Sequence, residues 1–322
     1  MSTLLLTRTD VVRHMEALTL LSEMREAFQA DAQARSVEPQ RARSALHAEG
    51  STLVVFPGIL PGIPAYTVKV HARFPGRSPA IQGVVQLHDL ETGALLAVMD
   101  SGHLTALRTG VVGALASDVL ARQDASRVAL IGAGPQASMQ LKSLRLVRSL
   151  NHVRVYDPDL ALSIAFATRM YHALNLPVRP AESVEEAVGD ADIVVTATGA
   201  PSREPFLYPG MLRAGTHLTA LGADEPGLAE VSAGLLRQST FFCDNRALAL
   251  AMGAPAGVGL GEEVIHAELG EVLAGTKAGR TEPGQVTIFG AVGLPFQDLV
   301  AAWHVYQGAR HDDTVQRVDF LA

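Results

Sequence analysis

The pattern of apolar and polar positions changes character near residue 125 of this chain. Before that point, apolar residues at helical spacing from Val11 to Ala34, preceded by Asp10 as an N-cap, predict one helix. Short apolar runs separated by turn residues then predict strands at 53–56, 65–71, 83–88 and 94–99. A stretch rich in small residues over 104–121 predicts another helix. The first part of the chain is therefore expected to be an α+β unit.

From residue 125 onward, short apolar runs alternate with helical segments, which is typical of a parallel sheet covered by helices. Strands are expected at 128–131, 153–156, 193–197, 217–222, 241–244 and 286–290. A last helix over 298–308 is expected to return to the first domain. The predicted boundaries are 1–120 with 299–322 for the α+β domain, and 121–298 for the inserted domain.

The apolar run that ends at Ile131 passes directly into a glycine turn, and a helical stretch follows it. This order places the amides of a helix N-terminus against a pyrophosphate. Gly132 permits the turn, Gly134 lets the backbone approach the phosphates, and Ala137 allows close packing of helix on strand. We therefore predict that a dinucleotide binds along the loop formed by Gly132, Gly134, Pro135, Gln136 and Ala137.

The next apolar run ends at Asp157, 25 residues after Gly132. A carboxylate at this place accepts hydrogen bonds from the ribose hydroxyls of the adenosine. The following residue is Pro158 and not an arginine that could bind a 2′-phosphate, so NAD is favoured over NADP. An ordinary βαβ unit without a ligand is the alternative. The predicted fold class is thus α/β, a Rossmann-type NAD domain inserted in an α+β domain.

The amino-acid composition and net charge argue against several classes of function. With 322 residues, 48% of them hydrophobic and 18% charged, the chain has the composition of a globular protein. The net charge of −7 and the lack of a basic run argue against a nucleic-acid partner. Cys243 is the only cysteine, which fits a reducing cytoplasm. We expect no metal site, because the histidines lack ligand spacing. We expect no membrane partner, because the longest charge-free stretch of the first domain, 50–68, contains three prolines and does not form a membrane helix.

Three cations in the first domain are candidates for binding an anionic ligand. Lys69 interrupts an apolar strand, and Arg108 lies in a helix that is otherwise apolar and small. A cation on an apolar element must extend to solvent, pair with an acid or bind an anion, and an arginine fork suits a carboxylate. A structural ion pair is the alternative for both residues. Arg41 is the third candidate, and because Arg43 is close by, a surface position is its alternative.

Two loops after strands of the second domain are further candidates. Asp224 follows a predicted strand on a glycine loop, from which it could act as a general base or anchor an ammonium group. A turn aspartate is its alternative. Val292 and Gly293 follow the last strand and are expected beside the nicotinamide, with a simple tight turn as the alternative.

These residues together resemble the ornithine cyclodeaminase/mu-crystallin family over nearly the whole chain. The resemblance is carried by residues 39–41, 56–57, Lys69, 97–100, 104–109, 132–137, 222–224 and 288–293. Family members include ornithine cyclodeaminases, alanine dehydrogenases, reductases of cyclic imino acids and the ketimine reductase mu-crystallin. The resemblance implies a homodimer built through the first domain, which would also bind the substrate.

The resemblance also implies roles for single residues. Arg41, Lys69 and Arg108 would gather the substrate carboxylate, and Asp224 would meet the amine and assist proton transfer. We therefore name Lys69 and Asp224 as catalytic candidates. Thr109, the last residue of the matching stretch 104–109, is a further candidate cofactor-binding residue.

Two positions depart from the pattern of true ornithine cyclodeaminases. Those enzymes resemble one another in having a glutamate where this chain has Val54 and a lysine where it has Leu228. A valine cannot hold the distal ammonium of ornithine. The favoured function is an NAD-dependent oxidoreductase that transfers hydride at Cα of a small α-amino acid or cyclic imino acid. The alternatives are ornithine cyclodeaminase and a non-catalytic, crystallin-like binding protein.

Overall fold

A computed structural model describes residues 2–34, 38–74, 77, 79–198 and 203–320. The chain divides into two compact units, unit 1 formed by Met1–Arg108 with Leu294–Ala322 and unit 2 formed by Thr109–Gly293. The first boundary lies inside helix α3 (Ser101–Leu120), earlier than the end of the helix where the sequence pattern suggests a division. The second lies just before helix α11 (Pro295–Ala309), where Pro295 begins a new helix.

Unit 1 contains a seven-stranded sheet in the order β15-β1-β6-β5-β4-β3-β2. Its neighbouring strands are antiparallel except for the parallel pair β1–β6. The strands are β1 (Thr3–Leu6), β2 (Ala42–Ala45), β3 (Thr52–Gly58), β4 (Ala65–Arg73), β5 (Ile81–Asp89), β6 (Leu95–Asp100) and β15 (Gln316–Val318). The four expected strands correspond to β3–β6. Strands β1, β2 and β15 are additional to the predicted set.

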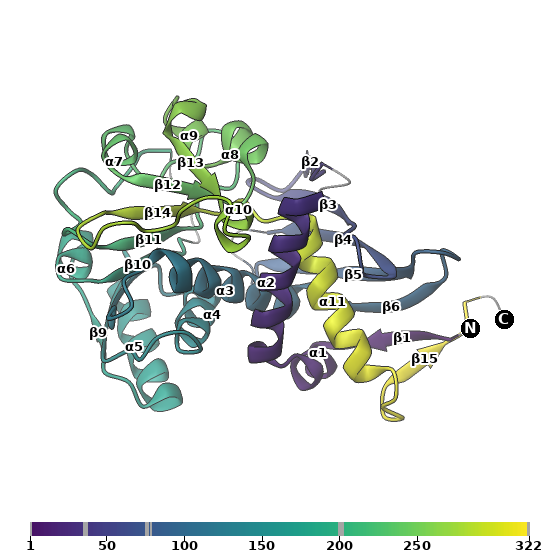
Figure 1. Cartoon of the computed structure of the whole chain (residues 1–322). Helices are drawn as coiled ribbons and strands as arrows, with labels where there is room; N and C mark the ends of the chain where they lie inside the picture. Colours follow the sequence, from purple (N-terminus) through teal and green to yellow (C-terminus); the bar gives the residue numbers. More distant parts are fainter. Residues whose placement is uncertain (1, 35–37, 75–76, 78, 199–202, 321–322) are drawn as a thin grey trace. The chain divides into compact units, whose positions relative to one another are not determined.

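Alternation along β3 and β4 places one set of side chains under helix α11. Val54 and Phe56 on β3 are buried on the same face as Lys69 on β4, and Phe56 is the direct partner of Lys69 in the register. Helices α2 (Ala17–Ala34) and α11 run side by side, as Figure 1 shows. The rings of Phe28 on α2 and Phe296 on α11 pack edge to face, with their centroids 5.1 Å apart. This packing fixes the face of α11 that is turned toward the sheet.

The N-terminal segment forms two helices instead of the single helix that the sequence predicts. Helix α1 (Arg8–His14) has Thr7 as its N-cap, and Asp10 is its capping-box partner rather than the N-cap itself. Met15 is extended and ends this helix. The carboxylate of Glu16 then accepts hydrogen bonds from the amides of Leu18 and Thr19, so it caps the start of α2.

Unit 2 contains an eight-stranded parallel sheet in the order β13-β12-β14-β11-β10-β7-β8-β9. Its strands are β7 (Arg127–Ile131), β8 (His152–Tyr156), β9 (Val178–Pro180), β10 (Ile193–Thr196), β11 (His217–Ala220), β12 (Thr240–Cys243), β13 (Ile265–Glu268) and β14 (Thr287–Gly290). The order β9-β8-β7-β10-β11 is that of a Rossmann-type sheet, with the switch point between β7 and β10. The predicted α/β class is confirmed.

Both faces of this sheet are covered, as expected for a parallel sheet. Leu130 packs in a cluster with Val153 and Phe166 on one face, while its neighbour Ile131 joins the cluster on the other face. The helices of unit 2 beyond α3 are α4 (Pro135–Leu144), α5 (Leu160–Leu174), α6 (Val184–Val188), α7 (Ala233–Gln238), α8 (Arg246–Met252), α9 (Ala254–Gly257), α10 (Leu269–Leu273) and the 3-10 helix η1 (Glu262–Val264).

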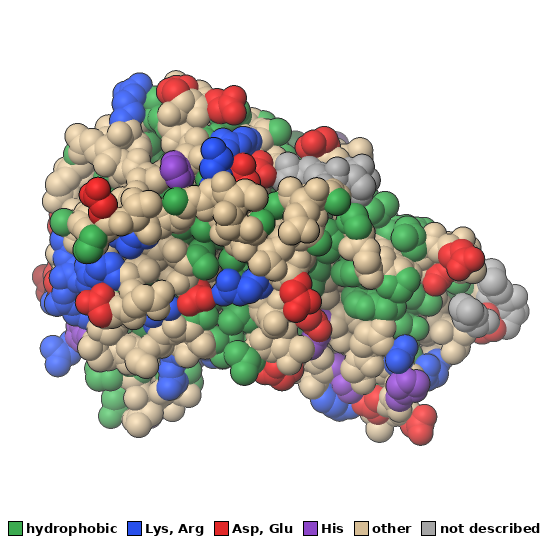
Figure 2. All heavy atoms as spheres, in the orientation of Figure 1, with side chains coloured by type: hydrophobic (Ala, Val, Ile, Leu, Met, Phe, Trp, Pro, Cys, Tyr) green, Lys and Arg blue, Asp and Glu red, His purple; other side chains and the backbone are tan. Residues whose placement is uncertain are grey.

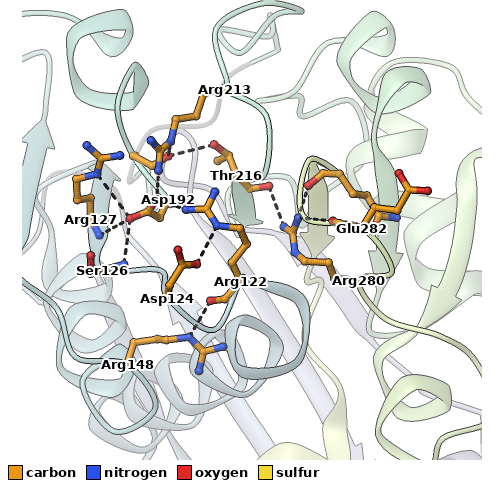
Figure 3. A network of polar contacts seen from close by, with 12 residues as sticks. Arg122, Asp124, Ser126, Arg127, Arg148, Asp192, Arg213, Thr216, Arg280 and Glu282 are labelled. Atoms are coloured by element: carbon orange, nitrogen blue, oxygen red, sulfur yellow. Dashed lines mark hydrogen bonds and ion pairs between the residues drawn. The ribbon is translucent and has the colours of Figure 1, made fainter.

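A buried acid ties together the amino ends of the strands in unit 2 (Figure 3). Asp192 is 4% exposed and accepts hydrogen bonds from the amides of Ser126 and Arg127. Its carboxylate is also paired with the guanidinium groups of Arg122 and Arg213. Arg127 Nε lies 3.7 Å from the same carboxylate. The charge of Asp192 is therefore compensated by three cations and two amides, as burial of a carboxylate requires. This network belongs to the edge of the sheet opposite to the glycine turn.

The surface carries charges of both signs. On the face drawn in Figure 2, acidic and basic side chains lie intermixed over unit 2, and hydrophobic side chains gather over β4 and β5 of unit 1. Among the described residues, no helix combines the length and the apolar character needed to cross a bilayer.

Candidate functional site

Lys69 and Arg108 of unit 1 share one buried carboxylate. The Lys69 Nζ lies 2.6 Å from Oδ2 of Asp298, and Arg108 Nε donates to the Oδ1 atom at 3.1 Å. Lys69 is 0% exposed, and Asp298 lies in the first turn of α11. The structural ion pair considered from the sequence is thus present, yet two buried cations face a single acid. An additional anion bound here would balance the second positive charge.

The ring of Phe56 brings the third predicted cation into the same cluster. Lys69 Nζ lies 4.4 Å from the centroid of this ring, and Arg41 Cζ lies 5.1 Å from it. Both distances are within the range of cation–π attraction. The three cations predicted from the sequence, Arg41, Lys69 and Arg108, therefore lie close together around β3, β4 and the start of α11.

Burial and charge act in opposite directions on the ionisable groups of this cluster. Burial lowers the pKa of Lys69 to about 8, with the nearby charge of Arg108 acting in the same direction and Asp298 opposing it. Burial disfavours the charged form of Asp298, but Arg108 and Lys69 hold its pKa below the usual value. The cluster therefore stays ionised at neutral pH, and Lys69 is its most easily discharged member.

Gln297 supplies a hydrogen-bond donor that has no partner within the described part of the chain. Its Oε1 accepts from Arg108 Nη1 at 2.5 Å, which fixes the orientation of the amide. The Nε2 atom is then left as a buried donor without an acceptor, although the residue is only 1% exposed. A buried unpaired donor is costly unless a ligand oxygen satisfies it. Two cations and this amide form a donor set suited to a carboxylate.

The neighbouring part of the same sheet face is neutral. His71 follows Lys69 by two residues on β4 and is paired in register with Val54 on β3. Burial and the charge of Lys69 lower the pKa of His71 to about 3, so its imidazole is uncharged at neutral pH. Its Nδ1 atom has no hydrogen-bond partner among the described residues. Val54 and His71 therefore contribute no negative charge at the position where ornithine cyclodeaminases have a glutamate.

The glycine turn of unit 2 has the geometry predicted for a phosphate loop. Gly132 has φ +106°, and a Cβ atom there would lie 2.4 Å from the carbonyl oxygen of Ala197. At Gly134 a Cβ would meet nothing within 4 Å, so the space over this backbone is open. Gly134 is the N-cap of α4 and makes no side-chain capping bond. Pro135 begins the helix and Ala137 is fully buried behind it, so the open helix end fits a pyrophosphate.

Asp157 contacts this loop, and Thr109 contacts the helix that follows it. The Asp157 carboxylate accepts from the amide of Ala133 at 3.0 Å and from the amide of Asp159 at 3.1 Å. The carbonyl of Thr109 accepts from Nε2 of Gln140 on α4 at 2.9 Å. These contacts place the predicted ribose ligand Asp157 at the turn and Thr109 beside helix α4, which follows the turn. Their contact with a dinucleotide stays a prediction.

The loop that carries Asp224 follows β11. Gly222 begins the loop, and Asp224 is half-buried in it. Leu228, at the position where ornithine cyclodeaminases have a lysine, packs with Ala223 and Val231 in the hydrophobic core of unit 2. The side chain of Leu228 is therefore part of the core. It differs from the lysine of ornithine cyclodeaminases chiefly because it carries no positive charge.

A second buried acid holds the loop after β14. The amides of Val292 and Gly293 donate to Oδ2 of Asp244, at 2.9 and 2.6 Å. Gly293 has φ +94°, which favours glycine at this position. Burial raises the pKa of Asp244 to about 6, and the hydrogen bonds from Gly293, Val292 and Asn245 oppose that shift. Both predicted residues thus lie in a fixed loop whose amides already have an acceptor.

Sequence reasoning missed Asp298, Gln297 and Asp244. Asp298 and Gln297 stand in an apolar helix, and no local pattern joins them to Lys69 or Arg108, which are far away in the chain. The one available signal was that a cation in an apolar strand requires a buried acid or a ligand, without indicating which acid.

The fold defines a class of Rossmann-type enzymes in which a parallel α/β unit is combined with an α+β unit. The family model described as ornithine cyclodeaminase/mu-crystallin matches residues 1–313. The chain belongs to this family, and the resemblance stated from its sequence motifs is confirmed.

Individual relatives match over the whole chain. Alanine dehydrogenase of Archaeoglobus fulgidus is 32% identical over 329 residues, which cover 100% of this chain and 99% of the relative. An archaeal alanine dehydrogenase dimer with bound NAD is 30% identical with a TM-score of 0.92, covering 99% and 100% of the two chains. Δ1-Pyrroline-2-carboxylate reductase of Thermococcus litoralis, solved with NADH and L-proline, is 29% identical with a TM-score of 0.92, covering 98% and 100%.

Proposed function

We propose that this protein is an NAD-dependent oxidoreductase that acts on a small α-amino acid or a cyclic imino acid by hydride transfer at Cα. The observation that carries the proposal is the donor set of unit 1. Lys69 and Arg108 share one carboxylate, and the buried amide of Gln297 has a donor atom left over. This arrangement is suited to the carboxylate that all α-amino and α-imino acids have in common.

The turn from Gly132 to Ala137 and the carboxylate of Asp157 are proposed to hold NAD through its pyrophosphate and adenosine ribose. The open space over Gly134 and the uncapped N-terminus of α4 support this assignment. When bound, NAD supplies or accepts the hydride exchanged with the substrate Cα. Thr109, Val292 and Gly293 are proposed as further residues of the cofactor site.

The residues of this chain would then perform three tasks. Arg108, Lys69 and Arg41 would fix the substrate carboxylate, and this positioning lowers the barrier by restricting the motion of Cα. Asp224 would accept or return the proton on the substrate nitrogen, or activate a water molecule that attacks the imine. In the reductive direction, the same aspartate would keep the imine protonated and therefore electrophilic.

The neutral face formed by Val54 and His71 supports a short or cyclic substrate side chain. A distal ammonium, as in ornithine, would require a buried negative charge to replace its hydration. Val54 is 3% exposed and His71 is uncharged at neutral pH, so neither can provide that charge. Alanine and five-membered cyclic imino acids lack a distal charge and fit this environment better than ornithine does.

We further propose that the protein is a cytoplasmic homodimer joined through unit 1. Strand alternation leaves one face of the sheet with half-buried and exposed apolar side chains, on the side opposite to Lys69. This face carries Val55, Val68, Val70, Val84 and Val98. Val55, Val70 and Val84 are paired in the register and form an apolar row across three strands, whereas Gln86 lies between Val68 and Val98. An apolar row of this kind is typical of a subunit interface. The archaeal alanine dehydrogenase that the chain resembles is itself described as a dimer.

The test follows nicotinamide absorbance with purified protein and separate substrates. NAD⁺ is offered with L-alanine, L-proline or L-ornithine, and NADH is offered with Δ1-pyrroline-2-carboxylate, while proline and ammonia are quantified in parallel. Net formation or consumption of NADH with alanine, proline or the cyclic imine is expected. Proline and ammonia from ornithine without net NADH would instead identify ornithine cyclodeaminase. Saturable NADH binding without turnover of any substrate would identify a binding protein.

A further inference from the structure

Glu230 is a buried acid at the carboxyl edge of the sheet in unit 2, and the proposed chemistry does not use it. Its side chain accepts three hydrogen bonds, from Thr196 Oγ1 at 2.5 Å, Thr198 Oγ1 at 2.7 Å and the amide of Gly222 at 2.8 Å. The residue is only 1% exposed. Burial raises the pKa of its carboxyl group, and these hydrogen bonds oppose the shift.

The three donors come from the two segments that leave neighbouring strands. Thr196 ends β10 and Thr198 follows it, while Gly222 begins the loop after β11 that carries Asp224. Thr196 Oγ1 also accepts from the amide of Leu221 at 3.3 Å. The carboxylate of Glu230 is thus a common acceptor through which both segments are held together.

The backbone of Glu230 is itself fixed. Its carbonyl oxygen accepts from the amides of Phe206 and Leu207, both at 3.0 Å, and Leu207 pairs with Val231 in an isolated bridge. The chain between Gly222 and Glu230 therefore forms a closed loop, anchored at one end by this bridge and at the other by the Glu230 side chain. The Glu230 carboxylate packs directly against the backbone of Gly222, since a Cβ on Gly222 would lie 2.1 Å from Glu230 Oε1.

We infer that Glu230 is a positioning residue for catalysis, which sets the place of Asp224 by holding the start of its loop against the end of β10. The inference rests on the proposed role of Asp224 in proton transfer. A carboxylate that accepts from two hydroxyls and one amide defines the loop geometry more sharply than packing alone, since each hydrogen bond is directional. Displacement of a proton-transfer group by about 1 Å can reduce the rate about 100-fold.

Glu230→Gln tests the inference, because glutamine keeps the volume but cannot accept hydrogen bonds with both of its terminal atoms. We expect kcat to fall about 10- to 100-fold, while the Kd for NADH, measured by fluorescence, changes less than about threefold. Thr196→Val removes one donor with little change of shape, and a smaller fall in kcat is expected. It also provides a second measurement if the Glu230→Gln protein does not fold.

Asp192→Asn is the matched control, since Asp192 is an equally buried acid of the same sheet at its opposite edge (Figure 3). This variant is expected to lower the melting temperature and to retain kcat. If folded Glu230→Gln and Asp192→Asn lose kcat equally, Glu230 has only a structural role and the inference is overturned. Unchanged kcat in a folded Glu230→Gln protein would also overturn it.

A double-mutant cycle separates this inference from the proposed function. If Glu230 acts through Asp224, then Glu230→Gln should cause little further loss of kcat in an Asp224→Asn background. Independent, multiplying losses would overturn the positioning role while leaving Asp224 as a catalytic residue. Full activity of Asp224→Asn alone would contradict the proposed role of Asp224 and, with it, the mechanism by which Glu230 is inferred to act.

Discussion

The ammonium group of Lys69 lies 2.6 Å from the carboxylate of Asp298, and both side chains are almost completely removed from solvent. The same carboxylate accepts from Arg108, so loss of Asp298 would leave two buried cations without their acid. Breaking a buried pair by removing one partner is much more costly than losing an exposed pair.

Asp298→Asn is therefore expected to destabilise unit 1 by about 3–5 kcal/mol, measured by urea denaturation. The denaturation should be followed with probes for both units, since two compact units can unfold in separate transitions. Arg13→Gln is the control, because Arg13 is 49% exposed and its pairs with Asp10 and Asp312 lie at the surface. A similar small loss in both variants would contradict the view that Asp298 is the shared acid of two buried cations.

The pKa of Lys69, lowered to about 8 by burial, gives a pH dependence of substrate binding. Lys69 is charged below this pH and becomes neutral above it, so its attraction for a carboxylate is lost as the pH rises. In the reductive direction, kcat/KM for Δ1-pyrroline-2-carboxylate is expected to decline above about pH 8, since this ratio reports ionisation of the free enzyme. The Kd for NADH should stay constant over the same range.

Lys69→Arg separates this effect from titration of the substrate. Arginine keeps its charge at all accessible pH values, so the decline in kcat/KM should move to higher pH or vanish. A substrate group would titrate identically with both proteins. An unchanged alkaline limb in Lys69→Arg would therefore exclude Lys69 as its source.

Two glycines of the same turn give opposite predictions. A Cβ at Gly132 would lie 2.4 Å from a backbone oxygen, and its φ of +106° is unfavourable for alanine, so Gly132→Ala is expected to lower the melting temperature. Gly134→Ala has open space and should melt within about 2 °C of the native protein. Its methyl group would, however, occupy the approach to the pyrophosphate and raise the Kd for NADH at least about tenfold. Unchanged NADH affinity in Gly134→Ala would argue against dinucleotide binding at this turn.

The contrast between the two glycines and Asp298 shows what the sequence can predict here. The turn at Gly132, the following helix and Asp157 are consecutive parts of one βαβ unit, so their spacing alone indicates their arrangement. The same holds for the strands β3–β6, whose apolar runs are bounded by turn residues. Local signals also have limits, as Asp10 shows, since an acid before an apolar run can be the N-cap or the third residue of a capping box.

Asp298, Gln297 and Glu230 could not be assigned in this way. Arg108 and Asp298 are 190 residues apart, and their contact depends on how α11 packs on the sheet of unit 1. Many other acids in the chain could have balanced Lys69 equally well by charge alone. The sequence therefore predicts Lys69 and Arg108, because these cations interrupt apolar patterns. It does not predict Asp298 and Gln297, the acid and the amide that contact them.

His217 gives a prediction for stability in acid. Its imidazole is fully buried on β11, with Nδ1 3.0 Å from Thr287 Oγ1 and Nε2 3.1 Å from Thr219 Oγ1. Burial lowers its pKa to about 3 from the ordinary 6.5, so between these values the unfolded chain binds a proton that the folded chain does not. The free energy of unfolding then decreases as the pH falls.

Between pH 6.5 and pH 4.5 this single group should remove about 2–3 kcal/mol from the stability of unit 2. His217→Gln removes the titration, so the urea midpoint of this variant should depend less steeply on pH, even if the variant is less stable at pH 7. His172→Gln, at an exposed position of α5, is the control and should retain the native slope. Equal slopes for native protein and His217→Gln would mean that the buried imidazole does not control this pH dependence.

The uncovered face of the sheet in unit 1 gives the last prediction. Val70 on β4 is half-buried on the face opposite to Lys69, and its direct partners in the register are Val55 on β3 and Val84 on β5. Val70→Lys would place a charge in the middle of this apolar row, and burying an unpaired ammonium in an interface is strongly unfavourable. Light scattering after size exclusion should therefore show a dimer for the native protein and a monomer or a concentration-dependent mixture for the variant. Val12→Lys, at an exposed valine of α1, is the control and should remain dimeric. If Val70→Lys is as dimeric as the native protein, the interface lies elsewhere, and a monomeric native protein would contradict the proposed assembly itself.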